Sequence, residues 1–329
     1  MALTYSPNLY SGTLYQEIFQ EIFFANKTVR DGYVRLIDNV KDATILTSMS
    51  STTAIKDYQA EPTTSTALTP SDTSLAPVQV MLYEEFDPNT LRGSRFAVDM
   101  APGSFNMISN EFERAVMEHF AGKFGSSIER AIWQNVKTAD KTAVAAAGSL
   151  NADVKRGWSQ SDALVSMNGL WGKATITAAI AATGVKIATK NTDVATAFAN
   201  LLSTCPTEAV MREDFTIFAP REYYQVILAK NSASTYRDVF TVIPETKEVF
   251  YQGIPVKFVP LTYTTATAAA CLIAGPANDL VVGADLFSDT NTIEIGKKYN
   301  YADTMFVKAK FSLDTAVMFP ANFTVQCNY

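Results

Sequence analysis

The sequence predicts an α+β fold, and three observations support this prediction. Apolar residues fill nearly every odd position from Met305 to Phe319, while polar residues occupy several even ones, an alternation typical of a strand with one buried face. Apolar residues spaced four apart from Ile108 to Val136 indicate a long helix. Between them, Phe215–Ala219 predicts a short buried strand, and Pro220 opens a helix at its favoured first position. Strands and helices arranged in this way indicate α+β architecture.

The first 41 residues contain a short apolar pattern. Leu14, Ile18 and Ile22 share helical spacing, which predicts an amphipathic helix over about residues 14–25. Its apolar stripe needs a covering surface, and that surface could belong to the same chain or to a neighbouring molecule.

The stretch after this segment is rich in Thr, Ser and Pro, above all from Thr63 to Pro77. Composition alone predicts a loop there. However, β-like runs at residues 43–49 and 78–83 bracket it, so we expect the two runs to be the strands of a long hairpin. A loop of this length in a compact domain usually has a function.

The helix from Ile108 to Val136 would be roughly 43 Å long at 1.5 Å per residue. Its four-residue spacing exceeds 3.6, so the apolar line drifts about 40° at each step. We therefore expect the helix to be covered from different sides along its length. Gly122 and Gly125 each cost up to ~1 kcal/mol in a helix interior, so a bend or break there is an alternative.

The rest of the chain adds shorter elements. Residues 192–205 predict a helix. Residues 249–260 predict two short strands around Gly253, with Pro255 confining that segment to an edge or a bulge. The strand over residues 305–319 would reach roughly 50 Å at ~3.3 Å per residue, so we expect it to extend over another part of the structure.

Composition limits the function classes. With 329 residues and 47% hydrophobic content, the chain can bury one large core or two modest ones. Charged residues make up 18%, below the ~25% of typical soluble domains, which favours surfaces covered by neighbours, although a large core is an alternative. The net charge of −6 and the lack of a Lys/Arg cluster argue against a nucleic-acid reader.

No secretory signal or membrane span is predicted. Cys205, Cys271 and Cys327 are odd in number and far apart, which predicts buried thiols rather than a disulfide.

Catalytic motifs are missing from the sequence. His119 is the one histidine, and a structural or solvent-facing role is expected for it. There is no G-x-S-x-G elbow and no glycine-rich nucleotide motif. We therefore predict no enzyme activity and no catalytic, cofactor or metal site.

Three segments in order resemble the major capsid proteins of tailed bacteriophages, the Hong Kong 97 type: YQGIPVKFVP (251–260), LIAGPANDLVVGADL (272–286) and MFVKAKFSLDTAVMFP (305–320). The resemblance implies an α+β Hong Kong 97-like capsid fold with five regions. These are an N-terminal arm (1–41), an extended β-hairpin loop (42–100), a peripheral domain with the long spine helix (101–160), an axial domain (161–300, with the 248–260 hairpin as an alternative peripheral part) and the closing strand of the peripheral domain (301–329).

The resemblance also implies a function. Copies of the chain would assemble as hexamers and pentamers into an icosahedral virion capsid around the double-stranded DNA of a tailed phage, in the host cytoplasm and without a membrane partner. Portal and decoration proteins are further candidate partners. Too little chain precedes the extended loop for a built-in scaffolding domain, so we expect a separate scaffolding protein or none. The alternatives are an encapsulin-type nanocompartment shell, a phage tail component or an enzyme of different fold.

In the family, the arm and the extended loop reach neighbouring subunits, so inter-subunit contacts are expected there. Lys56 with Asn322 or Asn328 could also supply the isopeptide cross-link that some members form. The candidate contact residues are Phe19, Phe23, Phe24, Lys56, Tyr58, Glu84, Glu85, Arg92 and Arg95.

Overall fold

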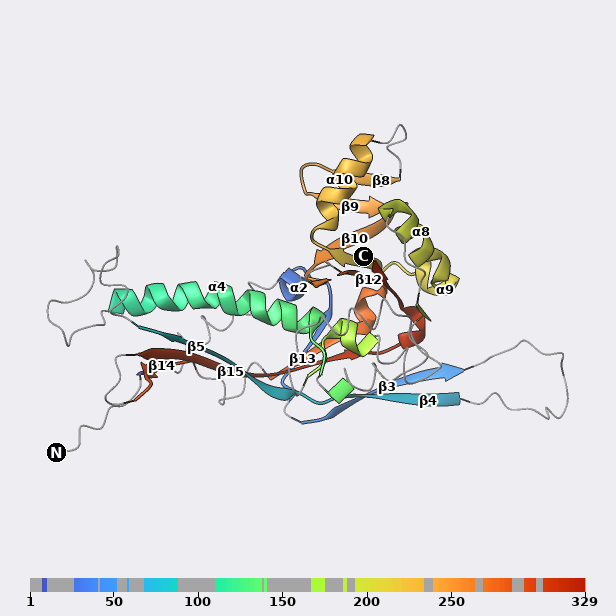
Figure 1. Ribbon diagram of the computed structural model, residues 1–329. Coiled ribbons are helices and arrows are strands. Elements are labelled where there is room, and N and C mark those ends of the chain that lie inside the picture. The colour runs from blue at the N-terminus through green and yellow to red at the C-terminus, as the bar shows by residue number, and fades with distance from the viewer. Residues whose placement is uncertain are drawn as a thin grey trace, which may run out of the picture.

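The structure is a computed structural model that describes residues 8–10, 27–40, 42–51, 58, 68–87, 110–137, 139–140, 167–174, 186–187, 193–233, 239–263, 269–285, 293–299 and 304–328. Figure 1 shows three parts: a long lower layer that contains one long helix, an upper lobe of helices and short strands, and a hairpin that projects from the lower layer.

Strand β15 (Met305–Val317) lies at the centre of a six-stranded sheet. Its first half pairs with β14 and β5, and its last residues pair with β13. The predicted alternation is confirmed, because the odd-numbered residues from 305 to 313 are buried and the even-numbered ones are partly or fully exposed as far as Ser312. From Leu313 onward every residue of β15 is buried. The remaining strands are β1 (Asn8–Tyr10), β2 (Arg35–Asp38), β5 (Val78–Phe86), β13 (Leu280–Ala284) and β14 (Ile293–Lys297).

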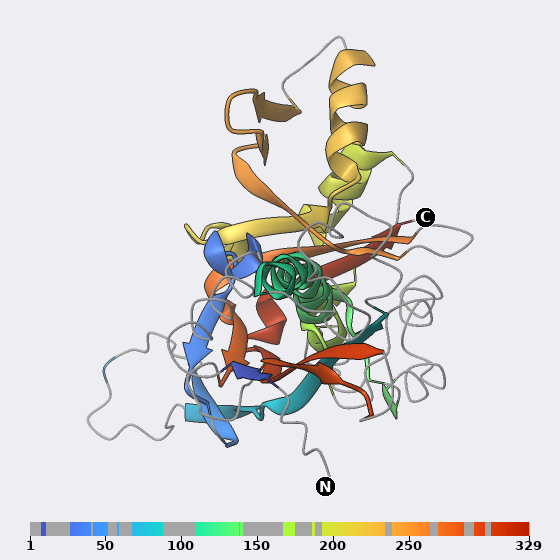
Figure 2. The same ribbon diagram turned by 90° about the vertical axis from the view of Figure 1, so that its left-hand side faces the viewer.

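Helix α4 (Asn110–Gln134) confirms the predicted long helix. It continues through Gly122 and Gly125, so a break at these glycines is not found. Figure 2 looks along α4 and shows it between the two large sheets. The Trp133 ring near its end lies 4.9 Å from the ring of Phe218, which belongs to the second sheet. The helix is therefore covered from more than one side, as its four-residue spacing predicts.

The second sheet has eight strands in the order β6-β16-β12-β7-β10-β9-β8, with β11 beside β12. Helices α8, α9 and α10 lie beside this sheet in the upper lobe (Figure 1). Thr324 to Asn328 form β16, next to β12. The elements are β6 (Lys186–Ile187), α8 (Val194–Thr204), α9 (Thr207–Val210), β7 (Phe215–Pro220), α10 (Tyr223–Ala233), β8 (Phe240–Ile243), β9 (Glu248–Tyr251), β10 (Ile254–Val259), β11 (Thr262–Tyr263), β12 (Ala269–Pro276) and β16 (Thr324–Asn328).

The predicted hairpin around Gly253 is formed by β9 and β10. Gln252 and Gly253 both have positive φ, 50° and 85°, as a two-residue type I′ turn requires. The expectation that Pro255 confines β10 to an edge is wrong, because β10 lies between β9 and β7. The pairing with β7 begins at Val256, so Pro255 has no strand partner on that side and its missing N–H breaks no ladder bond.

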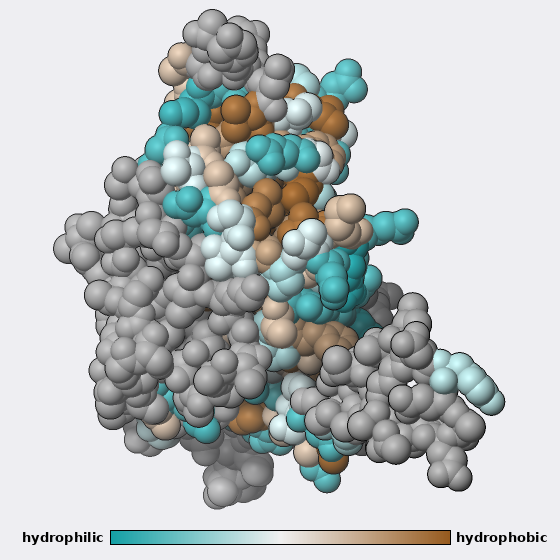
Figure 3. Space-filling model, turned by 90° about the vertical axis from the view of Figure 1, so that its right-hand side faces the viewer, coloured by the Kyte–Doolittle hydropathy of each residue, from teal (hydrophilic) through white to brown (hydrophobic). Residues whose placement is uncertain are grey.

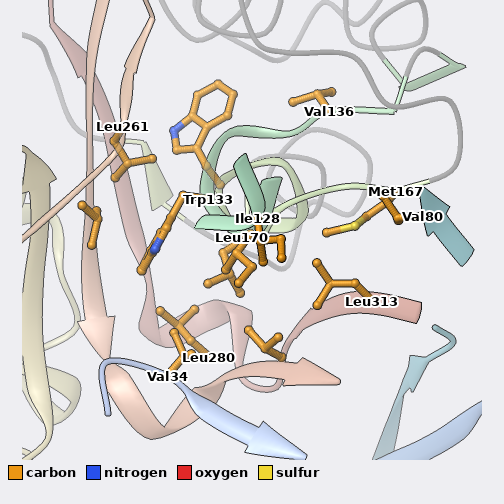
Figure 4. Packing of buried hydrophobic residues seen from close by; sticks show 14 of the residues in the cluster. Val34, Val80, Ile128, Trp133, Val136, Met167, Leu170, Leu261, Leu280 and Leu313 are labelled. Atoms are coloured by element: carbon orange, nitrogen blue, oxygen red, sulfur yellow. The ribbon is translucent and has the colours of Figure 1, made fainter. Parts of the chain in front are cut away.

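Two cores lie on opposite faces of the second sheet. In β7, Phe218 belongs to the cluster around α4, while its neighbours Ile217 and Ala219 belong to the cluster under α8 and α10. Strand β12 sorts its residues in the same way, because successive side chains point to opposite faces. Figure 4 shows the α4 cluster, with Trp133 and Leu170 near its centre. Of the two arrangements that composition allows, the chain has two principal cores.

The cysteines differ from the prediction. Cys271 on β12 is disulfide-bonded, so the expectation of three thiols is wrong. Cys205 is a buried free thiol whose Sγ donates to the carbonyl oxygen of Leu201 at 3.2 Å. Spacing along the sequence did not reveal that Cys271 and Cys327 are direct partners in the register of β12 and β16.

Candidate interaction surface

The structure describes three of the nine predicted contact residues. Tyr58 lies beyond the end of β3 (Thr44–Ser51) and is 95% exposed. Glu84 and Glu85 lie on β5. The other six are outside the described residues: Phe19, Phe23, Phe24, Lys56, Arg92 and Arg95.

A hairpin of β3 and β4 (Leu68–Leu75) projects from the lower layer (Figure 1). A hairpin was predicted here, but its second strand is β4 and not the predicted run at residues 78–83. Strand β4 lies inside the Thr/Ser-rich stretch that composition favours as a loop, and the run from Val78 pairs instead with β15. The physical reason is burial: polar residues suit a hairpin in water, whereas the alternating apolar residues of β5 need a core.

The hairpin exposes large apolar side chains. Ile45 is 63% exposed and Met49 is 65% exposed. They are four residues apart on one strand, so both lie on the same face. Asp72 lies on the neighbouring strand, opposite Thr47 and thus between them. Exposed apolar side chains that share one face are typical of an interaction surface.

The base of the hairpin is fixed to the lower layer. Leu75 is fully buried in a cluster with Val40, Val281 and Ala316. The next residue, Ala76, donates its backbone N–H to Oδ2 of Asp314 on β15 at 2.9 Å. The hairpin therefore projects from an anchored end.

The outer face of β5 carries Met81 and Tyr83, which are 53% and 41% exposed. The Tyr83 ring stacks on Phe306 at 5.8 Å, and its hydroxyl donates to Glu85 at 2.7 Å. This hydrogen bond raises the pKa of Tyr83. Lys298 lies 2.7 Å from Glu85, and its hydrogen bond lowers the pKa of that carboxyl. Glu85 is therefore an ionised group with a cation of its own chain beside it.

Glu84 points to the other face of β5. Its Oε1 accepts from Nζ of Lys123 on α4 at 2.9 Å. The two neighbouring acids thus serve different contacts, as strand alternation requires. Both have partners within the chain and both keep part of their surface in water. Their role between subunits stays a prediction.

The upper lobe also exposes large apolar side chains. Helix α10 buries Ile227 but leaves Val226 and Leu228 at 44% and 40% exposure, and Ile243 on β8 is 37% exposed. Figure 3 shows brown, hydrophobic side chains over the upper half of that face of the molecule. The upper lobe and the projecting hairpin are therefore two separate places where apolar groups face water.

A buried polar network joins three parts of the chain. Trp133 on α4 donates its Nε1–H to Oγ1 of Thr28 at 2.7 Å, and Thr28 donates to Glu129 at 3.2 Å. Arg221, at the start of the upper lobe, lies 2.6 Å from the other carboxylate oxygen of Glu129. Thr28 belongs to the short helix α2 (Lys27–Arg30). The sequence does not reveal this network, because its partners lie about a hundred positions apart and none belongs to a recognisable motif.

Beside this network is a polar cavity of about 500 Å³. Tyr33 in its wall has its pKa raised to about 12 by burial and by the nearby Asp31. The cavity is also lined by Lys27, Arg221, Tyr224, Thr246, Lys247, Glu248, Val256, Lys257 and Phe258.

Two other features, a metal cluster and a membrane-spanning helix, are not found in the part of the chain that the structure describes. No three His, Cys, Asp or Glu side chains gather there as a metal site would require. The described helices include none long and apolar enough to cross a membrane.

The sequence matches no family model and no curated protein. Solved structures do match. A chain of the satellite phage P4 procapsid including size determination (Sid) protein has a TM-score of 0.57 at 12% identity, over 97% of this chain and 92% of that one. The chain has the Hong Kong 97-type capsid fold. A chain of Microbacterium phage Oxtober96 has a TM-score of 0.52 at 11% identity, and one of Mycobacterium phage Bobi 0.50 at 10%, each over 100% of this chain and 96% of that one.

The predicted Hong Kong 97-type fold is thus confirmed. At these identities the likeness concerns the fold. The predicted boundaries of the arm, the extended loop and the peripheral and axial domains stay predictions.

Proposed function

We propose that the chain is a major capsid protein, a structural protein that assembles into the icosahedral shell of a tailed phage around double-stranded DNA. The observation that carries the proposal is the likeness to a chain of the satellite phage P4 procapsid, which extends over 97% of this chain and 92% of that one. A likeness of this extent involves the whole fold and not one shared substructure.

The exposed surfaces suggest how copies would associate. Ile45 and Met49 are about two-thirds exposed, so complete burial of each against a neighbour would contribute roughly 1–2 kcal/mol. Exposed apolar side chains of the upper lobe, such as Leu228 and Ile243, would add contacts of their own. Individually weak contacts allow a misplaced subunit to dissociate, whereas a closed shell makes all of them at once.

The proposed partners follow from this role. The chain would contact its own copies in hexamers and pentamers, and a portal and separate scaffolding or decoration proteins would complete the particle. Its net charge of −6 suits a shell that encloses DNA without holding it at specific sequences. The location would be the virion capsid, after assembly in the host cytoplasm.

Electron microscopy of the expressed protein tests the proposal, and closed shells are the expected result. A small oligomer or a tube would overturn it, and shells that contain a cargo enzyme but never DNA would indicate a nanocompartment instead. The double variant Ile45→Asp/Met49→Asp should lose shells while the subunit keeps its free energy of unfolding. Met211→Asp is the matched control, because Met211 is 82% exposed away from the hairpin and shells should persist.

A further inference from the structure

The C-terminal strand β16 is held unevenly in its sheet. On one side, β12 pairs with all five residues from Thr324 to Asn328. On the other side, β6 pairs with Thr324 and Val325 alone. Within the described part of the chain, residues 326–328 therefore have a neighbouring strand on one side.

A cysteine pair lies in the part of β16 that β6 does not reach. Cys271 on β12 and Cys327 on β16 are direct register partners, and direct partners in an antiparallel pair have Cβ atoms at a separation that a disulfide can bridge with a small adjustment. Cys271 is disulfide-bonded. The chain has three cysteines. Cys205 is outside the disulfide and lies in the core under α8 and α10, on the face of the sheet opposite to the core that contains Cys271.

We infer that Cys271 and Cys327 form a disulfide that fastens the C-terminal strand β16 to β12. The link would hold β16 where β6 no longer pairs with it. This inference does not depend on the proposed capsid function, because it concerns the closure of a single subunit.

The chemistry of the link is an oxidation. Each thiol loses one proton and one electron, the two S–H bonds break, and one S–S bond forms between the sulfur atoms. Dioxygen accepts the two electrons and two protons and becomes hydrogen peroxide. In a reducing cytoplasm the glutathione pool opposes this step, so the link would form when the chain meets dioxygen outside such surroundings.

The position of Cys271 predicts how the link responds to reductants. Its side chain is 0% exposed within the cluster that contains Trp133 and Phe323. A thiolate must reach a sulfur atom to open a disulfide. We therefore expect dithiothreitol to leave the link intact in the folded protein and to cleave it once the protein is unfolded.

Peptide mapping tests the inference. Full-length protein, purified in air without reductant, is unfolded in the presence of N-ethylmaleimide, digested and mapped by mass spectrometry without reduction. The expected result is one alkylated cysteine, Cys205, and one linked pair of peptides that contain Cys271 and Cys327. Three alkylated cysteines, a link to Cys205, or a link between two chains on a non-reducing gel would each overturn the inference.

Two variants sharpen the test. Cys205→Ser should keep the linked pair and show no alkylated cysteine, whereas Cys327→Ser should show two. Dithiothreitol should lower the unfolding midpoint of the wild-type protein and of Cys205→Ser after equilibration in denaturant, and leave that of Cys327→Ser unchanged. If Cys327→Ser does not fold, the wild-type map still decides. Because no readout here involves shells, failure of this inference is distinguishable from failure of the proposed function.

Discussion

The contact of Arg221 with the buried Glu129 gives an asymmetric mutational prediction. Glu129 is 5% exposed, whereas the side chain of Arg221 is 51% exposed. Removing one partner of an ion pair is costly chiefly when the charge left behind is buried. Arg221→Ala leaves the buried carboxylate with Thr28 as its donor, while Glu129→Gln leaves a guanidinium that water can reach.

The expected magnitudes follow from this difference. A buried charge without its partner costs about 3–5 kcal/mol, and the partial exposure of this pair places Arg221→Ala near about 2–3 kcal/mol. Glu129→Gln keeps an acceptor for Thr28, and water can reach the half-exposed guanidinium, so loss of the charge-assisted hydrogen bond should cost about 1.5 kcal/mol, the low end for a bond between charged groups. The double variant should then be more stable than Arg221→Ala alone, because the orphaned charge is gone.

Urea unfolding of the disassembled subunit at low protein concentration, followed by tryptophan fluorescence, measures these free energies of unfolding. Trp133 belongs to the network and should report its loss directly. Arg221→Lys is the control that keeps a positive charge near the carboxylate. If Arg221→Ala costs no more than Glu129→Gln, or if the double variant loses the sum of the two single effects, the network does not couple the upper lobe to α4.

Three further changes have defined outcomes. Gly275→Ala would place a Cβ in steric overlap with the buried ring of Phe323, so we expect a loss of about 2 kcal/mol or more in the free energy of unfolding. Asp193 caps α8 and pairs with Lys230, so Asp193→Ala should cost about 1 kcal/mol at neutral pH. The hydrogen bond from Lys230 lowers the pKa of Asp193, so this difference should shrink as the pH falls below about 4. Burial raises the pKa of Asp279, so the folded state binds the proton of this carboxyl more tightly than the unfolded state does. The stability of the wild type relative to Asp279→Asn should therefore fall as the pH rises above about 4. Unfolding curves of both proteins at several pH values measure this difference.

Elements set by local burial patterns could be predicted from the sequence. The alternation in β15 records one buried face, the four-residue spacing in α4 records an apolar line that drifts around the helix, and Gly253 marks the turn between β9 and β10. The opposite directions of Glu84 and Glu85 were also predictable from strand alternation. Pairings between distant segments were not.

The register that places Cys271 opposite Cys327 and the network around Glu129 depend on which elements become neighbours in space. Periodicity within one segment does not contain that information. The same limit explains the hairpin, where two β-like runs were predicted to pair but the apolar one joined the core sheet.

The anchored hairpin explains how a small apolar surface could serve assembly. Association is opposed by the loss of freedom of the groups that become ordered, about 0.5–1.5 kcal/mol for each immobilised side chain. Leu75 and the bond to Asp314 fix the base of the hairpin within the subunit, and strand pairing fixes Ile45 and Met49 on one face. Because the fold has already ordered the backbone that carries these side chains, burying them against a neighbour costs less entropy than burying the same side chains on a segment that becomes ordered only on association. A contact of two side chains can then favour association even though its apolar area is small.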